Sequence, residues 1–232
     1  MSSELKTQNL LILKVPNDPC YTLSNTTHML NLFNKKLPHC DVLFEKFLSP
    51  WYEKDDRPKT TRPDMFQIDA YEGEPLNLDE LQSLDDEYLE YQKKHLNETM
   101  INAALDDFKH ITNSDQLDLN ALDAVDKFYD RAKIASLIKE SDPTDFSNAY
   151  LVTVCEFGTM LGNLFKQIDG FDWLYSHPYF DSIIIHKQTG FAITVFDWAV
   201  KKFSEYGVDD GFVEKFHAAI AGVNGEWINE EE

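Results

Sequence analysis

The fold is decided by the middle of the chain, where residues 76–142 read LNLDELQSLDDEYLEYQKKHLNETMINAALDDFKHITNSDQLDLNALDAVDKFYDRAKIASLIKESD, without a glycine or a proline. The whole chain contains 9 of each, so their absence over this length predicts helices rather than turns. Between residues 64 and 145 there are 21 acidic and 7 basic side chains, which account for most of the net charge of −20. An acidic helical surface repels nucleic acid and anionic membranes and attracts basic partners.

A helical period runs through residues 79–111, because apolar and aromatic residues recur there at intervals of three or four. These residues are Leu81, Leu84, Tyr88, Tyr91, Leu96, Met100, Ala104, Leu105, Phe108 and Ile111. We expect either one helix of about 45 Å, at about 1.5 Å per residue, or two helices separated at residues 95–97. A further helix is expected over residues 120–140, where it ends before Pro143 because a residue that precedes proline disfavours the helical conformation.

A third long helix is expected to begin at Asp145 or Ser147 and to run through Phe165, with Gly158 and Gly162 on its inward face. Each glycine costs a helix up to about 1 kcal/mol relative to alanine. Two glycines on one face therefore predict that a neighbouring element approaches the backbone closely. That neighbour belongs either to the same chain or to a second copy, so a structural homodimer is one alternative for this protein.

After Gly170 the pattern changes from helices to strands. Residues 171–175, 182–186 and 191–196 are rich in β-branched and aromatic residues, and the turn-forming sequence 187–190 joins the last two runs as a hairpin. Asp197 is expected to cap the next helix, and a final helix is expected over residues 209–220. Upstream, we expect a short strand or an arm at residues 10–15, a helix that is capped at residues 26–27 and ends near Pro38, a second helix at 41–48, and a proline-containing connection over 51–75.

These elements predict a predominantly helical α+β protein. An acidic helical region (residues 1–145) would pack on a C-terminal helix–β-hairpin–helix module (residues 146–232), with one continuous domain as the alternative. No apolar run approaches the roughly 20 residues that cross a bilayer, and residues 10–13 are too short for the core of a signal peptide. Cys20, Cys40 and Cys155 occur in unrelated contexts, as is typical of reduced thiols, so a cytoplasmic location is expected.

The C-terminal part contains a set of packing motifs. These are Leu161-Gly162-Asn163-Leu164, Gly170-Phe171-Asp172-Trp173, the hairpin over residues 183–195, and Lys201-Lys202-Phe203. In these motifs the segment 158–216 resembles a group of bacterial domains of unknown function, some of them thought to be immunity proteins. The resemblance covers about a quarter of the chain. It implies a bacterial α+β module and carries over no catalytic residue.

Few residues carry a recognisable chemistry. The sequence has no nucleophile elbow, phosphate-binding glycine loop, His-Glu-x-x-His or Cys-x-x-Cys motif, so we expect no catalytic residue, metal or cofactor. His177, Asp181 and His186 lie close together in sequence and could form a metal or hydrolase site in a cleft, which is the enzymatic alternative. His39 and Cys40 could pair as base and nucleophile, but adjacent side chains seldom point together.

The function that the sequence favours is the binding and masking of a basic protein partner, with a toxin-neutralising immunity protein as the concrete case. Nucleic acid and membranes are not expected as partners, given the negative charge. The expected partner-binding residues are acids in three helical clusters: Asp85, Asp86, Glu87, Asp106, Asp107, Asp118, Asp123, Asp126 and Asp130. The last four are spaced at intervals of three to five, which predicts a continuous negative stripe along one flank of a single helix.

Overall fold

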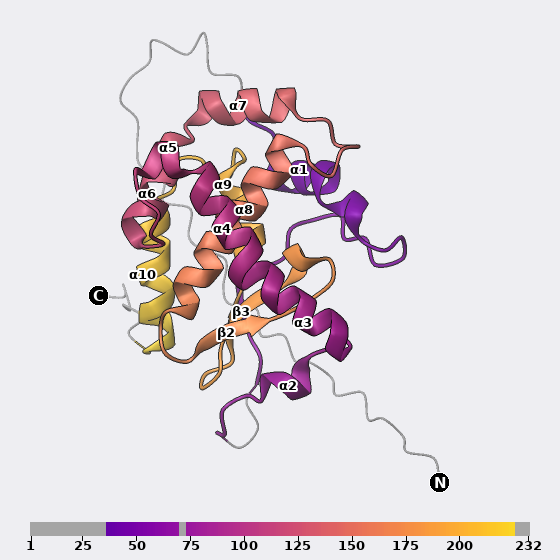
Figure 1. Cartoon of the computed structure of the whole chain (residues 1–232), viewed down its shortest axis with the longest axis vertical. Coiled ribbons are helices and arrows are strands. Elements are labelled where there is room, and N and C mark those ends of the chain that lie inside the picture. Colours follow the sequence, from indigo (N-terminus) through magenta and orange to yellow (C-terminus); the bar gives the residue numbers. More distant parts are fainter. Residues whose placement is uncertain (1–35, 70–72, 226–232) are drawn as a thin grey trace, which may run out of the picture.

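The computed structural model describes residues 36–69 and 73–225, and it has the predominantly helical α+β architecture that the sequence predicts (Figure 1). The helices are α1 (Cys40–Phe47), α2 (Leu78–Leu81), α3 (Asp86–Lys94), α4 (Met100–Asp107), α5 (Lys109–Thr112), α6 (Leu119–Phe128), α7 (Arg131–Glu140), α8 (Ala149–Lys166), α9 (Val195–Lys202) and α10 (Phe212–Val223). The strands are β1 (Met65–Gln67), β2 (Phe171–Leu174), β3 (Ile183–His186) and β4 (Phe191–Ile193). The strand or arm expected at residues 10–15 and most of the helix expected to end near Pro38 lie outside the described residues, and residues 36–39 are not helical.

The centre of the molecule is α8, which runs through the middle of Figure 1. Most of its residues are buried, as is typical of a helix enclosed by its own fold. It packs against α4, α6, α7, α9, β2 and β3. The helix begins after Asn148, whose side-chain oxygen accepts a hydrogen bond from the backbone N–H of Leu151. The expected cap at Asp145 or Ser147 is therefore wrong by one to three residues.

The two glycines of α8 face neighbours in the same chain, which confirms the close approach predicted from their spacing. A Cβ atom added at Gly158 would meet the ring of Phe196, and one added at Gly162 would overlap the indole of Trp173. Both glycines are buried. This face of α8 is thus filled from within, and the close packing that it permits joins α8 to α9 and β2.

The strands form one antiparallel sheet in the order β1-β4-β3-β2. The expected hairpin is confirmed, with Ile184 opposite Ile193 and a turn in which Gly190 adopts a φ of 73°. The strand β1 falls within the expected connection, and Met65 also lies opposite Ile193. The sheet therefore joins a strand from the N-terminal part of the chain to three strands that follow α8.

The segment that leads into β1 is held to α9 by side-chain ion pairs. Arg62 lies 2.8 Å from Asp197 and 2.8 Å from Asp181, and Lys201 pairs with Asp64. The expected capping role of Asp197 is wrong, because α9 begins two residues earlier, after Thr194. Asp197 is instead buried in the first turn of α9, where its carboxylate receives the Arg62 guanidinium.

The acidic middle of the chain (residues 76–142) forms more and shorter helices than the spacing of its apolar residues predicts. The helix expected over 120–140 is two helices, because Asp130 leaves the helical path and caps α7 by accepting a hydrogen bond from the Lys133 N–H at 2.9 Å. One helix and a separation at residues 95–97 are the two alternatives expected there, and the chain forms a π-helical segment, His95–Thr99, which links α3 to α4 without ending the helix. A π turn adds a residue to the helical repeat, so it rotates the faces of α3 and α4 relative to each other.

Candidate functional site

The first predicted acidic cluster lies at the start of α3. Asp85 caps the helix, since its carboxylate accepts a hydrogen bond from the Tyr88 N–H at 2.8 Å, and Asp86 and Glu87 occupy the first turn. All three acids are exposed. Negative side chains at this end stabilise a helix through its dipole, so the fold itself explains part of this cluster. The helix dipole does not account for the aromatic side chains beside it.

A surface pocket of 380 Å³ is lined by Asp85, Glu87, Tyr88 and Tyr91. The two tyrosine rings lie with their centroids 5.8 Å apart, and the side chain of Tyr91 is 58% exposed. The helical period places Tyr91 on the inward face, and this expectation is wrong. The helix α3 buries only Gln92, and the π segment that follows rotates its face away from the buried face of α4. The sequence thus presents two carboxylates and two phenol rings together at the surface, which we call the α3 pocket.

Histidine and tyrosine side chains hold the rings of the α3 pocket in place. The hydroxyl of Tyr88 shares a hydrogen bond of 2.7 Å with Nδ1 of His177. The ring of Tyr91 stacks on His95 at 5.7 Å and 8°, and His95 in turn contacts the edge of Tyr179 at 4.8 Å. Burial lowers the pKa of His95, so this imidazole is neutral at pH 7 and adds no positive charge beneath Tyr91. The pocket is therefore both ordered and negative.

The second cluster, Asp106 and Asp107, lies at the exposed end of α4. Asp107 is hydrogen-bonded to the buried Glu156 of α8. Burial, the hydrogen bond to Asp107 and the negative charge of Asp107 together raise the pKa of Glu156 to about 8. Glu156 is thus protonated near neutral pH and donates to the Asp107 carboxylate.

The third cluster does not form the continuous stripe that the sequence predicts. The single helix that would carry it is divided, and Asp118 and Asp130 are the caps of α6 and α7. Asp123 forms an exposed ion pair with Lys127 at 2.6 Å. Asp126 is buried, and its carboxylate pairs with the buried Lys202 at 2.5 Å. These four residues therefore have separate local roles, and Asp126 contributes to the core rather than to an exposed face.

A second pocket, of 350 Å³, lies between α6 and the start of α10. Its lining includes Asp123, Asp130 and Asp209, and it also includes several basic side chains. Arg131 pairs with Asp209 at 2.6 Å across it. Ion pairs of this kind neutralise most of the charges in this pocket. Its attraction for a basic partner is therefore weaker than that of the α3 pocket.

The residues of the enzymatic alternative have separate partners. His177 contacts Tyr88, Asp181 receives Arg62 and the Tyr52 hydroxyl, and His186 shares a hydrogen bond of 3.0 Å with Thr189. In the described parts of the chain, only one group of three histidine, cysteine or acidic side chains brings its ligand atoms together, and none of these three residues belongs to it.

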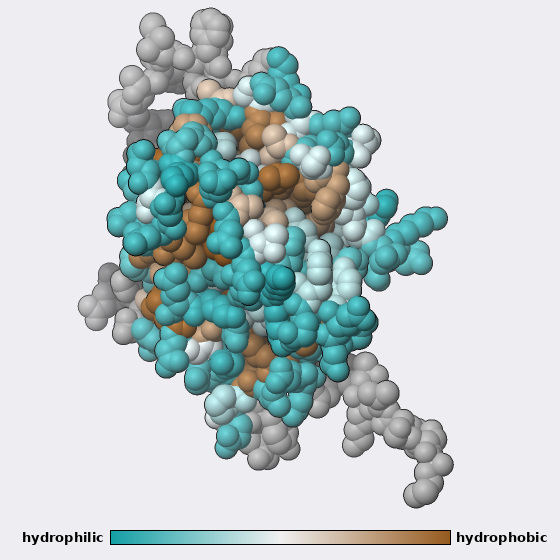
Figure 2. Space-filling view, in the orientation of Figure 1, coloured by the Kyte–Doolittle hydropathy of each residue, from teal (hydrophilic) through white to brown (hydrophobic). Residues whose placement is uncertain are grey.

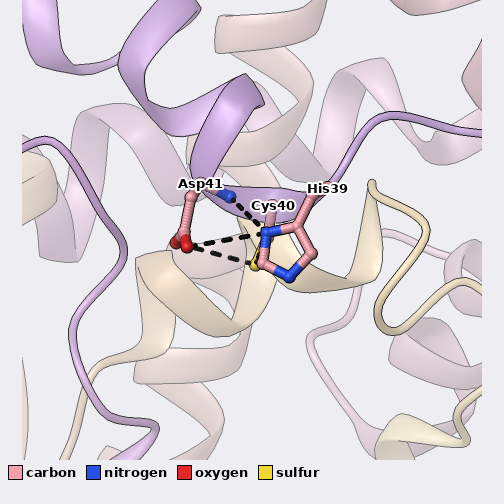
Figure 3. A group of neighbouring side chains, drawn as sticks. All are labelled: His39, Cys40 and Asp41. Atoms are coloured by element: carbon pink, nitrogen blue, oxygen red, sulfur yellow. Dashed lines mark hydrogen bonds and ion pairs between the residues drawn. The ribbon is translucent and has the colours of Figure 1, made fainter.

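That group is His39, Cys40 and Asp41, which converge where the chain enters α1 (Figure 3). Nδ1 of His39 lies 3.6 Å from Sγ of Cys40 and 3.5 Å from a carboxylate oxygen of Asp41, and Sγ lies 3.9 Å from the other carboxylate oxygen. From the sequence, His39 and Cys40 are not expected to point together, because they are adjacent, and Asp41 is not expected to join them. They meet here because His39 is the extended N-cap residue of α1, with Nδ1 turned back to accept a hydrogen bond from the Asp41 N–H at 3.3 Å.

The carboxylate of this cluster is held by a residue from a distant segment. The backbone N–H and the hydroxyl of Thr61 both donate to Oδ1 of Asp41, at 3.0 and 2.9 Å. Cys40 is buried, whereas the side chains of His39 and Asp41 are 55% and 36% exposed. Burial raises the pKa of the Cys40 thiol despite its contact with Thr61, so the free side chain is a thiol rather than a reactive thiolate.

Comparison with protein-family models, curated proteins and solved structures finds no match to this chain. The resemblance of residues 158–216 to bacterial domains of unknown function therefore stays a prediction. Across the described ranges no helix is both long and apolar enough to cross a bilayer. The proposed function therefore rests on the fold and the surface of this chain.

Proposed function

We propose that this protein is a non-enzymatic, cytoplasmic binding protein that masks a basic protein partner, with the neutralisation of a toxin as the concrete case. The observation that carries the proposal is the α3 pocket, in which Asp85 and Glu87 stand beside the rings of Tyr88 and Tyr91. In support of a reducing location, Cys40 and Cys155 are both free.

The chemistry of the α3 pocket suits the side chain of a lysine or an arginine. A carboxylate attracts the cationic group, and the negative face of a tyrosine ring adds a cation–π attraction of about 0.5–1 kcal/mol at an exposed site and about 2 kcal/mol once water is excluded. Tyr91 is the ring most available for this contact, since its face is held by His95 and more than half of its surface is exposed. Rigid, partly exposed tyrosines are also frequent hot spots in protein interfaces.

The remaining acids act over a longer range. Asp86, Asp106 and Asp107 are exposed on α3 and α4, where hydrophilic residues cover most of the face seen in Figure 2. With a net charge of −20, the protein attracts a basic partner before contact and repels nucleic acid and anionic membranes. Such attraction speeds association about 10- to 1,000-fold. The charge thus governs the rate of encounter, and the α3 pocket supplies an anchor for the bound state.

A differential capture experiment tests this proposal. Wild-type protein, Tyr91→Ala and Phe146→Ala are immobilised separately and exposed to a lysate of the native host at low salt. Phe146 is the matched control, because it is also an exposed aromatic residue (47%) that contacts one other ring, that of Trp51. A basic protein should bind to the wild type and to Phe146→Ala, and its affinity for Tyr91→Ala should be lower by about 2 kcal/mol, or roughly 30-fold.

Two outcomes would contradict the proposal. One is a captured protein that is itself acidic. The other is a basic protein that Tyr91→Ala retains as well as the wild type does, because its binding would then not use the α3 pocket.

A further inference from the structure

The cluster at the start of α1 has the dimensions of a zinc site. Zinc in proteins is tetrahedral, with bonds of about 2.3 Å to sulfur and about 2.0–2.2 Å to nitrogen and oxygen, so neighbouring ligand atoms are separated by roughly 3.3–3.6 Å. In the cluster, Nδ1 of His39 lies 3.6 Å from Sγ of Cys40 and 3.5 Å from Oδ2 of Asp41, and Sγ lies 3.9 Å from the other oxygen, Oδ1. With one ligand atom taken from each residue, the three atoms all lie within 4.8 Å of one another. The ligand atoms therefore lie near one another before zinc binds. Zinc at Nδ1 of His39 would take the lone pair that accepts the Asp41 N–H, so binding replaces that hydrogen bond.

The kinds of ligand atom in the cluster select the metal. A thiolate, an imidazole and a carboxylate form a mixed set that zinc accepts, whereas calcium and magnesium require oxygen ligands. Three protein ligands leave a fourth position for water. The exposed sides of His39 and Asp41 allow the ion to enter from solvent, and the buried Cys40 supplies the inner ligand.

Thr61 gives the cluster an independent feature of a metal site. Its two hydrogen bonds to Oδ1 of Asp41 fix the carboxylate from outside, and they leave Oδ2 as the oxygen that lies 3.5 Å from His39. Outer residues that orient a ligating carboxylate in this way are a regular part of metal sites. A bound zinc ion displaces the thiol proton, so binding should strengthen as the pH rises.

We propose that His39, Cys40 and Asp41 bind one zinc ion, with water as the fourth ligand. The ion joins the start of α1 to the segment at Thr61, which itself leads into the ion pairs with α9. The site is separate from the α3 pocket, so its test is independent of any protein partner.

The test uses the reduced, metal-free full chain and two metals. Zinc binding is measured by competition with a chromophoric chelator, and cobalt(II) is added in parallel because a cobalt–thiolate bond gives a charge-transfer absorption band. The variants are Cys40→Ser, His39→Asn and Cys155→Ser. Asparagine at position 39 keeps a good N-cap for α1, and Cys155 is the matched control as the other buried free cysteine. Circular dichroism checks that each variant is folded.

The wild type and Cys155→Ser should bind one equivalent of zinc and show the cobalt–thiolate band. Cys40→Ser should lose the band, and both Cys40→Ser and His39→Asn should bind zinc at least about 100-fold more weakly. The proposal is overturned if the wild type binds no stoichiometric zinc. It is also overturned if folded Cys40→Ser and Cys155→Ser bind zinc equally, which would place the metal on surface acids.

Discussion

The packing of α8 leads to a prediction about a single methyl group. In Gly162→Ala the new Cβ would overlap the indole of Trp173, which is 1% exposed and lies against Phe196 with the ring centroids 6.0 Å apart. The indole is enclosed and cannot move aside freely, so the overpacking cost should be near the upper end of the usual range, about 3 kcal/mol. The better helix propensity of alanine offsets about 1 kcal/mol. The free energy of unfolding should therefore fall by about 2 kcal/mol.

For a chain of this size such a loss lowers the melting temperature by about 4–8 °C. The decisive control is the Trp173→Phe background, because phenylalanine lacks the indole atoms that the Cβ would meet and no hydrogen bond of Trp173 Nε1 is lost. In that background Gly162→Ala should be neutral, or stabilising by up to about 1 kcal/mol. Unfolding in urea measures all four proteins. An equal cost of Gly162→Ala in both backgrounds would refute the close contact between α8 and Trp173.

Two further predictions concern buried charged groups. The pKa of Glu156 is about 8 in the fold and 4.5 when unfolded, so its contribution to stability is full below pH 4.5 and is lost as the pH rises through 8. The free energy of unfolding should fall by about 4 kcal/mol more between pH 5 and pH 9 in the wild type than in Glu156→Gln, and parallel pH profiles would contradict the assignment. Lys202→Met should cost about 3–5 kcal/mol in urea unfolding, because it leaves the buried Asp126 carboxylate unpaired. Adding Asp126→Asn should recover most of that loss, and a Lys202→Met variant within about 1 kcal/mol of the wild type would show that the pair is not buried as described.

Much of the C-terminal part could be predicted because short sequence patterns specify its secondary structure. The turn before Gly190 and the β-branched runs on each side specify the hairpin, and glycines four residues apart specify the close approach to α8. The strand β1 was missed because three residues in a proline-containing segment carry no usable period, and β1 exists through its pairing with β4. Tertiary pairing of this kind leaves no mark on the sequence of the strand itself.

The candidate sites were harder to predict, for two physical reasons. Tyr91 is exposed because the π segment at His95–Thr99 changes the helical register. A prediction that assumes a constant helical repeat cannot account for this change. The meeting of His39, Cys40 and Asp41 depends on the backbone of a helix N-cap, which turns one side chain back toward the first helical residues. The one sequence signal available for the cluster was a histidine directly before a helix start.

The central claim, that a negative surface around the α3 pocket attracts a basic partner, is tested most directly by association rates of two charge-matched triple variants. One triple neutralises the pocket end of α3: Asp85→Asn, Asp86→Asn and Glu87→Gln. Asparagine preserves the helix cap at position 85. The other triple removes the same three charges from an exposed loop: Glu53→Gln, Asp55→Asn and Asp56→Asn.

Rates are measured with the captured partner at salt concentrations of about 0.1 M and about 1 M, where the Debye length is about 10 Å and about 3 Å. The α3 triple should associate about 10-fold more slowly than the wild type at low salt and should depend less on salt, whereas the loop triple should stay close to the wild type. Equal rates for the two triples, or a wild-type rate that does not change with salt, would contradict the claim.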